Sequence, residues 1–172
     1  MTLRTILIHP DSRLRKVAAP VETVDDSFKA LAEDMFQTMY DAPGIGLAAT
    51  QVGVMKRLFV MDCAPSEETP EPLVAINPEI VWLSEETASS EEGCLSIPEV
   101  FADVTRPERV RLRWTDLDGV RNEAEFGERA ATCIQHEVDH LDGKLFIDYL
   151  SSVKRTMITS KMKKLKKEMA RA

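Results

Sequence analysis

The residues His136-Glu137-Val138-Asp139-His140 constrain the fold more than any other part of the chain. On a helix, positions i and i+4 face the same side, so both imidazoles could bind one cation. At about 100° per residue, Glu137 lies near that side, next to the apolar side chains and opposite the polar ones. Charged groups that face a protein interior are costly unless they are paired or metal-bound. We therefore expect a buried helix with a metal site, where Glu137 can handle protons on a bound water.

A catalytic metal site of this kind needs a third protein ligand besides the two histidines. Cys94 offers a thiolate and follows Gly93, which permits a close backbone approach. The spacing leaves open the alternative that Cys94 is only a small buried hydrophobic residue. His9 lacks a supporting context and is expected to be a surface or packing histidine. Cys133 lies one turn before His136, where it is expected to form a pocket wall, and ligation by Cys133 is the weaker alternative.

The segment Gly44–Gln51 is unusually rich in glycine and other small residues. It lacks the Lys-Ser/Thr pair of a P-loop and does not match the dinucleotide-binding pattern GxGxxG. Two glycines among small residues indicate a backbone that a substrate or another strand approaches closely. The side-chain amide of Gln51 could donate to a developing oxyanion. A tight structural turn explains the same residues equally well.

Local patterns predict helices near both ends of the chain and strands in the middle. Asp25-Asp26-Ser27 can cap a helix that ends near Tyr40. Further helices are expected at 128–142, closed by Gly143, and at 152–171. Strand patterns occupy 57–61, 73–76, 80–83, 110–115 and 120–126, and Asp118-Gly119 forms a hairpin turn between the last two. This order predicts an α+β fold rather than alternating βαβ units.

The composition excludes several classes of protein. A chain of 172 residues with 44% hydrophobic and 30% charged residues fits one globular domain spanning residues 1–172 and excludes a disordered chain. No apolar run approaches the roughly 20 residues that a membrane-spanning helix needs, and the N-terminus lacks a secretory pattern. We therefore expect a cytoplasmic protein without membrane contact. Three cysteines, an odd number, argue against a disulfide framework.

Charge is distributed unevenly along the chain. The net charge is −7, yet residues 154–171 hold eight basic residues against one acidic residue. Apolar residues recur at helical spacing in the same segment, at Ile158, Met162, Leu165 and Met169. We expect a basic C-terminal helix at 152–171 whose apolar stripe packs on the body while its lysines face solvent. Such a basic face could also contact a polyanion.

Three stretches together resemble the signature motifs of bacterial peptide deformylases, in the right order and at similar spacing. They are Gly44–Gln51, Glu92–Ser96 and Gln135–His140. The segment Phe146–Ser151 and the opening residues around His9 also look similar to that family, so the resemblance covers nearly the whole chain. It implies an α+β fold with antiparallel or mixed β-sheets around a central helix bearing His-Glu-x-x-His, followed by a C-terminal helix.

The resemblance also implies a set of metal-binding and catalytic residues. Cys94, His136 and His140 would bind one divalent metal ion, Fe²⁺ in the native enzyme, with Zn²⁺, Ni²⁺ or Co²⁺ able to replace it. Glu137 would be the general acid/base. The oxyanion would be stabilised by Gln51 and the backbone N–H of Leu95, with Gly46 nearby.

The implied reaction is the removal of the N-terminal formyl group from formyl-methionyl nascent polypeptides, with release of formate. Ile45 and Cys133 would line the pocket for the methionine side chain, and the wider substrate pocket would include Gly44, Glu92 and Gly93. The resemblance further implies that the basic C-terminal helix contacts ribosomal RNA. We expect a monomer.

One position departs from the pattern of the family. Some members carry Arg seven residues after the metal-binding cysteine, where this chain has Phe101, whereas Arg106 fits the family pattern. The change affects polar contacts with the substrate along that segment rather than the chemistry.

Two other classes of protein share part of this pattern. A zincin-like metallopeptidase has the same His-Glu-x-x-His core but usually takes its third ligand downstream, where this chain offers no histidine. A structural metal-binding module closes all four coordination positions with protein ligands, which would leave Glu137 without a purpose.

Overall fold

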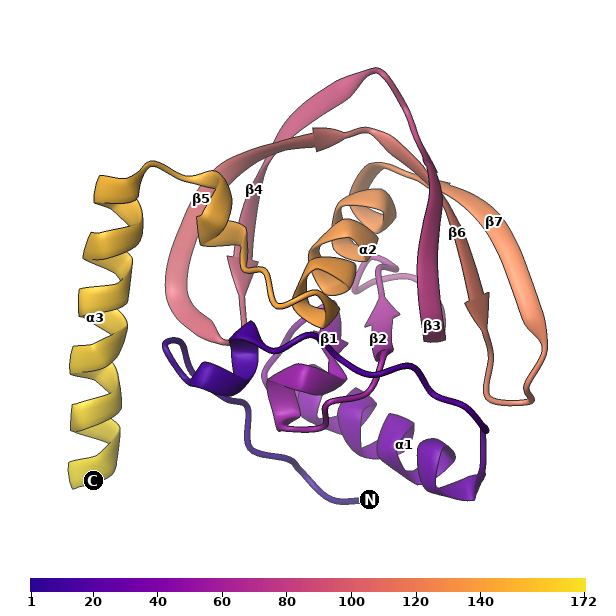
Figure 1. Ribbon diagram of the computed structural model, residues 1–172, viewed down its shortest axis with the longest axis horizontal. Coiled ribbons are helices and arrows are strands. Elements are labelled where there is room, and N and C mark those ends of the chain that lie inside the picture. The colour runs from indigo at the N-terminus through magenta and orange to yellow at the C-terminus, as the bar shows by residue number, and fades with distance from the viewer.

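The computed structural model describes all 172 residues and places helix α2 between two β-sheets (Figure 1). The helices are α1 (Asp26–Asp41), α2 (Glu128–Leu141) and α3 (Ser152–Arg171), with short 3₁₀ helices η1 (Ser12–Arg15), η2 (Ala49–Val52) and η3 (Phe146–Tyr149). The strands are β1 (Gly46–Ala48), β2 (Leu58–Asp62), β3 (Pro72–Leu83), β4 (Thr87–Cys94), β5 (Ile97–Pro107), β6 (Arg109–Thr115) and β7 (Arg121–Gly127).

Two antiparallel sheets surround α2. Five strands form one sheet in the order β1-β2-β3-β6-β7, while β4 and β5 form a separate two-stranded sheet. All pairs of neighbouring strands are antiparallel, which is one of the two arrangements that the family resemblance implied. The predicted α+β fold, with its central and C-terminal helices, is confirmed.

At strand β2 the five-stranded sheet is covered by a helix on each face. Successive side chains of a strand point to opposite faces, and every residue of β2 is buried. Leu58 and Val60 belong to a core cluster with residues of α1, whereas Phe59 and Met61 belong to a cluster with residues of α2. Helix α2 is therefore fixed from one side by an apolar contact with this sheet.

Helix α2 begins directly after β7 and ends at a glycine, as the sequence predicted. Gly143 has a φ of +75°, and a Cβ atom at this position would lie 2.5 Å from the carbonyl oxygen of Arg15. Glycine is therefore required on both steric and conformational grounds. The reversal at Gly143 carries the chain to η3, beside α2.

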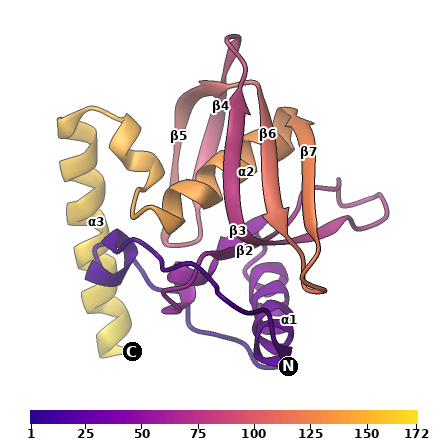
Figure 2. The same ribbon diagram turned by 45° about the vertical axis from the view of Figure 1, so that its right-hand side comes forward.

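Helix α3 stands at the edge of the molecule, next to β5 and the N-terminal segment (Figure 2). Met162 is fully buried in a third core cluster, and Ile158 and Leu165 pack against that cluster. The expectation that Met169 belongs to the packed stripe is wrong, because its side chain is 56% exposed. The body of the protein therefore packs against α3 only along residues 158–165.

Three strand assignments differ from the sequence-based expectations. Asn77 does not interrupt a strand: β3 continues through it with a shift of register, and the Asn77 side chain hydrogen-bonds the backbone of Val21. Residues 46–48 form the edge strand β1 within the glycine-rich segment. The β4–β5 hairpin was not predicted, because most of β4 is exposed and lacks an alternating pattern.

No helix of the protein combines the length and the apolar character needed to cross a bilayer.

The docking of α3 can be tested with two methionines of the same helix. We expect Met162→Ala to lower the free energy of unfolding by about 2–5 kcal/mol, because it removes a fully buried side chain. Met169→Ala should change it by less than about 0.5 kcal/mol, because that side chain is mostly exposed. Urea denaturation measures both values, and equal effects would contradict this docking of the helix.

Candidate metal centre and active site

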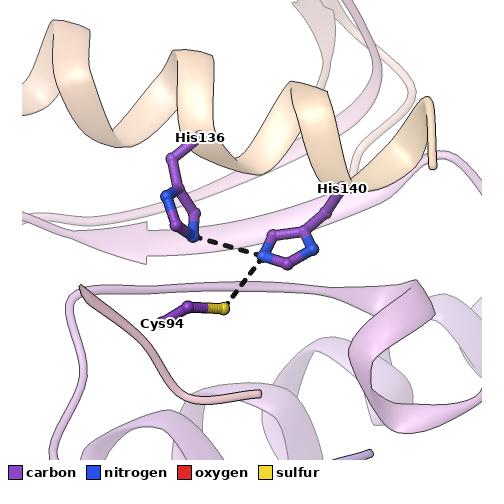
Figure 3. A group of neighbouring side chains, drawn as sticks. All are labelled: Cys94, His136 and His140. Atoms are coloured by element: carbon purple, nitrogen blue, oxygen red, sulfur yellow. Dashed lines mark hydrogen bonds between the residues drawn. The ribbon is translucent and has the colours of Figure 1, made fainter. Parts of the chain in front are cut away.

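Helix α2 and the end of β4 bring together one sulfur and two nitrogen atoms (Figure 3). His140 Nε2 lies 3.3 Å from Cys94 Sγ and 3.2 Å from His136 Nε2. All three side chains offer ligand atoms within 4.8 Å of one another. His9 is not part of this group; it is buried and its Nε2 hydrogen-bonds Thr159 of α3.

The donor set fits a divalent transition metal. Glu92 Oε1 lies 3.0 Å from His136 Nδ1, so that Nδ1 carries a proton and Nε2 is left with a lone pair. This lone pair of His136 lies close to His140 Nε2 and to the sulfur of Cys94, so a proton or a cation is needed among the three electron-rich atoms. Two imidazoles and one thiolate suit iron, zinc or cobalt. Cys94, His136 and His140 are thus the residues that could hold the ion.

Burial affects the two histidines differently. Burial lowers the pKa of His140 well below its usual value, and the neighbouring His136 lowers it further. Burial also opposes protonation of His136, but its interactions with Cys94 and Glu92 outweigh that effect and raise the pKa of His136 well above its usual value. Without an ion, a proton is therefore held more firmly by His136 than by His140.

Glu137 is buried next to the metal-binding group and faces the cleft. Glu137 is only 3% exposed, and its Oε2 atom has no hydrogen-bond partner in the protein. Burial raises the pKa of Glu137 to about 7. A carboxylate in this environment is poised to accept and release a proton near neutral pH.

Gln51 is oriented by its own backbone segment. Its Oε1 atom accepts a hydrogen bond from the backbone N–H of Ala48 at 2.9 Å, which turns the amide nitrogen the other way. That nitrogen donates to Ser96 Oγ at 3.1 Å and to Cys94 Sγ at 3.6 Å. Ser96 lies in one of the family-like motifs but had no predicted role; the structure shows it as a buried partner of Gln51.

A cleft of about 1500 Å³ opens at the metal-binding group. Among the residues predicted for the site, only His140 lies behind the cleft wall. The others line the cleft: Gly44, Ile45, Gly46, Gln51, Glu92, Gly93, Cys94, Leu95, Cys133, His136 and Glu137. Cys133 Sγ also lies 3.8 Å from the carbonyl oxygen of Ile45, so the two predicted pocket residues are in contact.

Phe101 stands at the rim of the same cleft. It pairs with Gly93 across the β4–β5 hairpin, and a Cβ atom at Gly93 would lie 2.6 Å from its ring. The ring covers the glycine and is still 64% exposed. Phe101 therefore places an apolar surface at the position where the resemblance implied an Arg in some members of the family.

Glu92 does more than line the cleft. Its carboxylate accepts two hydrogen bonds from Arg106, at 2.6 and 3.0 Å, while it contacts His136. Arg106 also donates to Asp139 at 3.0 Å, and Tyr149 donates to the same carboxylate at 2.7 Å. Neither Asp139 nor Tyr149 had a role predicted from the sequence. The only signal for them was that both lie in or next to motifs shared with the family.

A comparison with known families decides what kind of protein carries this site. Residues 3–156 match the family model described as polypeptide deformylase. The chain belongs to the polypeptide deformylase family. A peptide deformylase of Afipia carboxidovorans is 55% identical over 167 residues, covering 97% of this chain and 98% of the relative. One of Bartonella henselae is 50% identical over 168 residues, covering 98% and 96%.

Solved deformylase structures agree with this assignment. The crystal structure of a peptide deformylase from Legionella pneumophila matches with a TM-score of 0.91 at 47% identity, covering 99% of both chains. A peptide deformylase from Ehrlichia chaffeensis in complex with actinonin matches with a TM-score of 0.92 at 41% identity, covering 95% of this chain and 98% of that one. The predicted family, fold and hydrolase class are confirmed, and the zincin-like alternative is not supported.

Gly46 offers a test of how closely the deformylase site is packed. A Cβ atom at Gly46 would lie 2.7 Å from both Cys133 Sγ and Glu137 Oε1. We expect Gly46→Ala to lower kcat/KM for deformylation by about tenfold or more, because the Glu137 carboxylate must move.

Gly127→Ala is the matched control, since its nearest contact would be an ordinary 3.6 Å from Arg109. Steady-state kinetics of both variants at equal metal content provide the measurement. A Gly46→Ala enzyme as active as Gly127→Ala would contradict this close packing.

Proposed function

We propose that the protein hydrolyses the N-formyl amide of formyl-methionyl polypeptides and releases formate. The observation that carries this proposal is the Cys94/His136/His140 group beside the buried, unpartnered Glu137 at the head of a cleft, in a chain of the deformylase family. An exopeptidase or endopeptidase function has no comparable support.

Cys94 Sγ, His136 Nε2 and His140 Nε2 would hold the divalent ion. When bound, the ion polarises the formyl oxygen and makes a water molecule a better nucleophile at neutral pH. Glu92 keeps the lone pair of His136 directed at the ion through its contact with Nδ1.

Glu137 moves the protons. It accepts one from the attacking water and delivers it to the nitrogen of the departing amine, so that formate and a free N-terminus result. The amide N–H of Gln51 and the backbone N–H of Leu95 donate to the oxyanion that develops on the formyl oxygen as the formyl carbon becomes tetrahedral. Gly46 lets the reacting group approach, because its missing side chain leaves room beside Glu137.

The substrate backbone pairs with exposed strand edges. β4 bonds only to β5, and β1 is the first strand of its sheet, so each has one unpaired edge. Residues of both strands line the cleft. An extended peptide can add to such an edge through main-chain hydrogen bonds. Gly44, Glu92 and Gly93 then flank the peptide, and the methionine side chain enters between Ile45 and Cys133.

Fe²⁺ is the proposed native ion, with Zn²⁺, Ni²⁺ or Co²⁺ as substitutes. The support is the mixed donor set, since one soft thiolate and two imidazoles accommodate all four of these metals. The thiolate also reduces the net charge of the ion from +2 to +1, which lowers the cost of holding it in a largely buried site.

The role of Glu137 is testable without disturbing the fold. Glu137→Gln keeps the shape of the side chain but cannot accept the proton, so we expect kcat for formyl-Met-Ala to fall by at least about 100-fold. Formate release measures the activity, and metal analysis must show equal loading of variant and wild type. A fully metal-loaded Glu137→Gln enzyme with wild-type kcat would refute the assignment, and wild-type enzyme that released no formate would refute the proposed function.

The basic helix α3 is proposed to bind the ribosome near the emerging substrate. The support is its surface: lysines at 161, 164 and 167 are exposed, and the apolar stripe is directed at the body. Attraction to RNA phosphates makes such binding strongly dependent on salt. We also propose that the protein acts as a monomer in the cytoplasm and that residues 1–172 form a single domain.

A charge-reversed helix tests the ribosome proposal without removing the buried Met162. We expect Lys161→Glu/Lys164→Glu/Lys167→Glu to abolish co-sedimentation with ribosomes at low salt, while deformylation of a free dipeptide is unchanged. For each lysine that no longer touches a phosphate, the slope of log affinity against log salt becomes shallower by about one unit or slightly less. Ribosome binding that persists in the triple variant would contradict the proposal.

A further inference from the structure

The short helix η3 places one aromatic side chain against a metal-ligand residue and another against the residues that support it. Phe146 is 1% exposed, and its ring stacks on that of His136 with centroids 6.2 Å apart and planes inclined by 25°. Tyr149, at the other end of η3, lies over Arg106. Neither aromatic residue lines the cleft, so neither is placed to contact a substrate there.

Tyr149 contacts both members of the ion pair between Arg106 and Asp139. Its ring centroid lies 4.7 Å from Cζ of Arg106, and its hydroxyl donates to Asp139 Oδ2 at 2.7 Å. Arg106 is 5% exposed, whereas Tyr149 is 50% exposed. The tyrosine therefore covers the Arg106 guanidinium on its outer side. It also hydrogen-bonds Asp139, which is itself a partner of that guanidinium.

The guanidinium of Arg106 is shared between two carboxylates. Nε and one terminal nitrogen bind Glu92, and the other terminal nitrogen binds Asp139 Oδ2. Asp139 Oδ2 also accepts a hydrogen bond from the Tyr149 hydroxyl, so its interaction with Arg106 is weaker than it would be without the tyrosine. Without that hydroxyl, Arg106 would be drawn toward Asp139 and away from Glu92.

Glu92 is the link from Arg106 to the metal ligand. The same oxygen, Oε1, accepts from Arg106 and contacts Nδ1 of His136 at 3.0 Å. A displacement of Arg106 therefore changes the position of the carboxylate that fixes the tautomer and the orientation of the His136 ring.

We propose that Tyr149 is a positioning residue of the metal centre, acting through Arg106 and Glu92 to hold His136 in its ligating orientation. This inference rests on the proposed role of Cys94, His136 and His140 as metal ligands. Tyr149 touches neither substrate nor metal. Its effect is on how firmly the ion is held and on the geometry of its coordination.

The experiment compares three single variants of the full-length, metal-loaded enzyme. Tyr149→Phe removes the hydroxyl and keeps the ring over Arg106, and Tyr149→Ala removes both. Tyr40→Phe is the matched control, because Tyr40 is the only other tyrosine, is 48% exposed, and also donates its hydroxyl to an aspartate, Asp62. The readouts are the rate of Zn²⁺ release to a chromophoric chelator and the thiolate-to-Co²⁺ charge-transfer absorption of the Co²⁺ form.

Removal of a direct partner of a metal ligand typically weakens metal binding by about 10–100-fold. Tyr149 acts through Arg106 and Glu92, so we expect Tyr149→Ala to release Zn²⁺ faster than wild type by about tenfold, the lower end of that range, and Tyr149→Phe to lie between the two. The Co²⁺ absorption should change in both Tyr149 variants, and Tyr40→Phe should match wild type in rate and spectrum.

The inference is overturned if Tyr149→Phe and Tyr149→Ala, both folded by circular dichroism, release Zn²⁺ at the wild-type rate with an unchanged Co²⁺ spectrum. It is also overturned if Tyr40→Phe accelerates release equally, since the effect would then be general destabilisation. If Tyr149→Ala does not fold, Tyr149→Phe decides by the same criteria. A Cys94→Ser variant with wild-type Zn²⁺ affinity would instead refute the ligand set itself, and this inference with it.

Discussion

Helix α2 buries polar side chains on several sides, and much of the surrounding structure supplies partners for them. An unsatisfied buried polar group costs about 1–3 kcal/mol, so each must be paired or serve a purpose. Gln135 donates to the carbonyl oxygen of Pro107 at the end of β5, and Asp139 is bound by Arg106 and Tyr149. His136 is bound by Glu92 of β4. The β4–β5 hairpin is therefore held against α2 largely by polar contacts, while the five-stranded sheet holds the opposite side by apolar ones.

The exceptions to this pairing lie at the active site. Only two buried side-chain atoms lack a hydrogen-bond partner in the protein, Glu137 Oε2 and His140 Nδ1. Both belong to the motif that the chemistry requires. A fold that satisfies its other buried polar groups tolerates the cost at Glu137 because a carboxylate without a fixed partner is free to exchange protons with water and with the leaving amine. The stability of the scaffold and the reactivity of the site thus depend on the same helix.

Local features of the sequence were sufficient for the helices and not for the hairpin that completes the site. Caps and a 3.6-residue period are short-range signals, so α1, α2 and α3 were predicted within one or two residues. The polar strand β4 carries no alternation, and its register with β5, which pairs Ala88 with Arg106, cannot be read from composition. Polarity also does not predict exposure, since Gln135 is polar and yet only 6% exposed. Cys94 was assigned as a ligand only through the family resemblance, because it lies 42 positions before His136.

The central claim is that a single divalent cation is bound by Cys94, His136 and His140. Anomalous diffraction from crystals reconstituted with Zn²⁺ or Co²⁺ and measured at the absorption edge of the metal tests it most directly. The account predicts one dominant peak, about 2.0–2.1 Å from Nε2 of each histidine and about 2.3 Å from the sulfur of Cys94. Reconstituted crystals with no peak among these three side chains, or with the sulfur of Cys94 turned away from the peak, would contradict it.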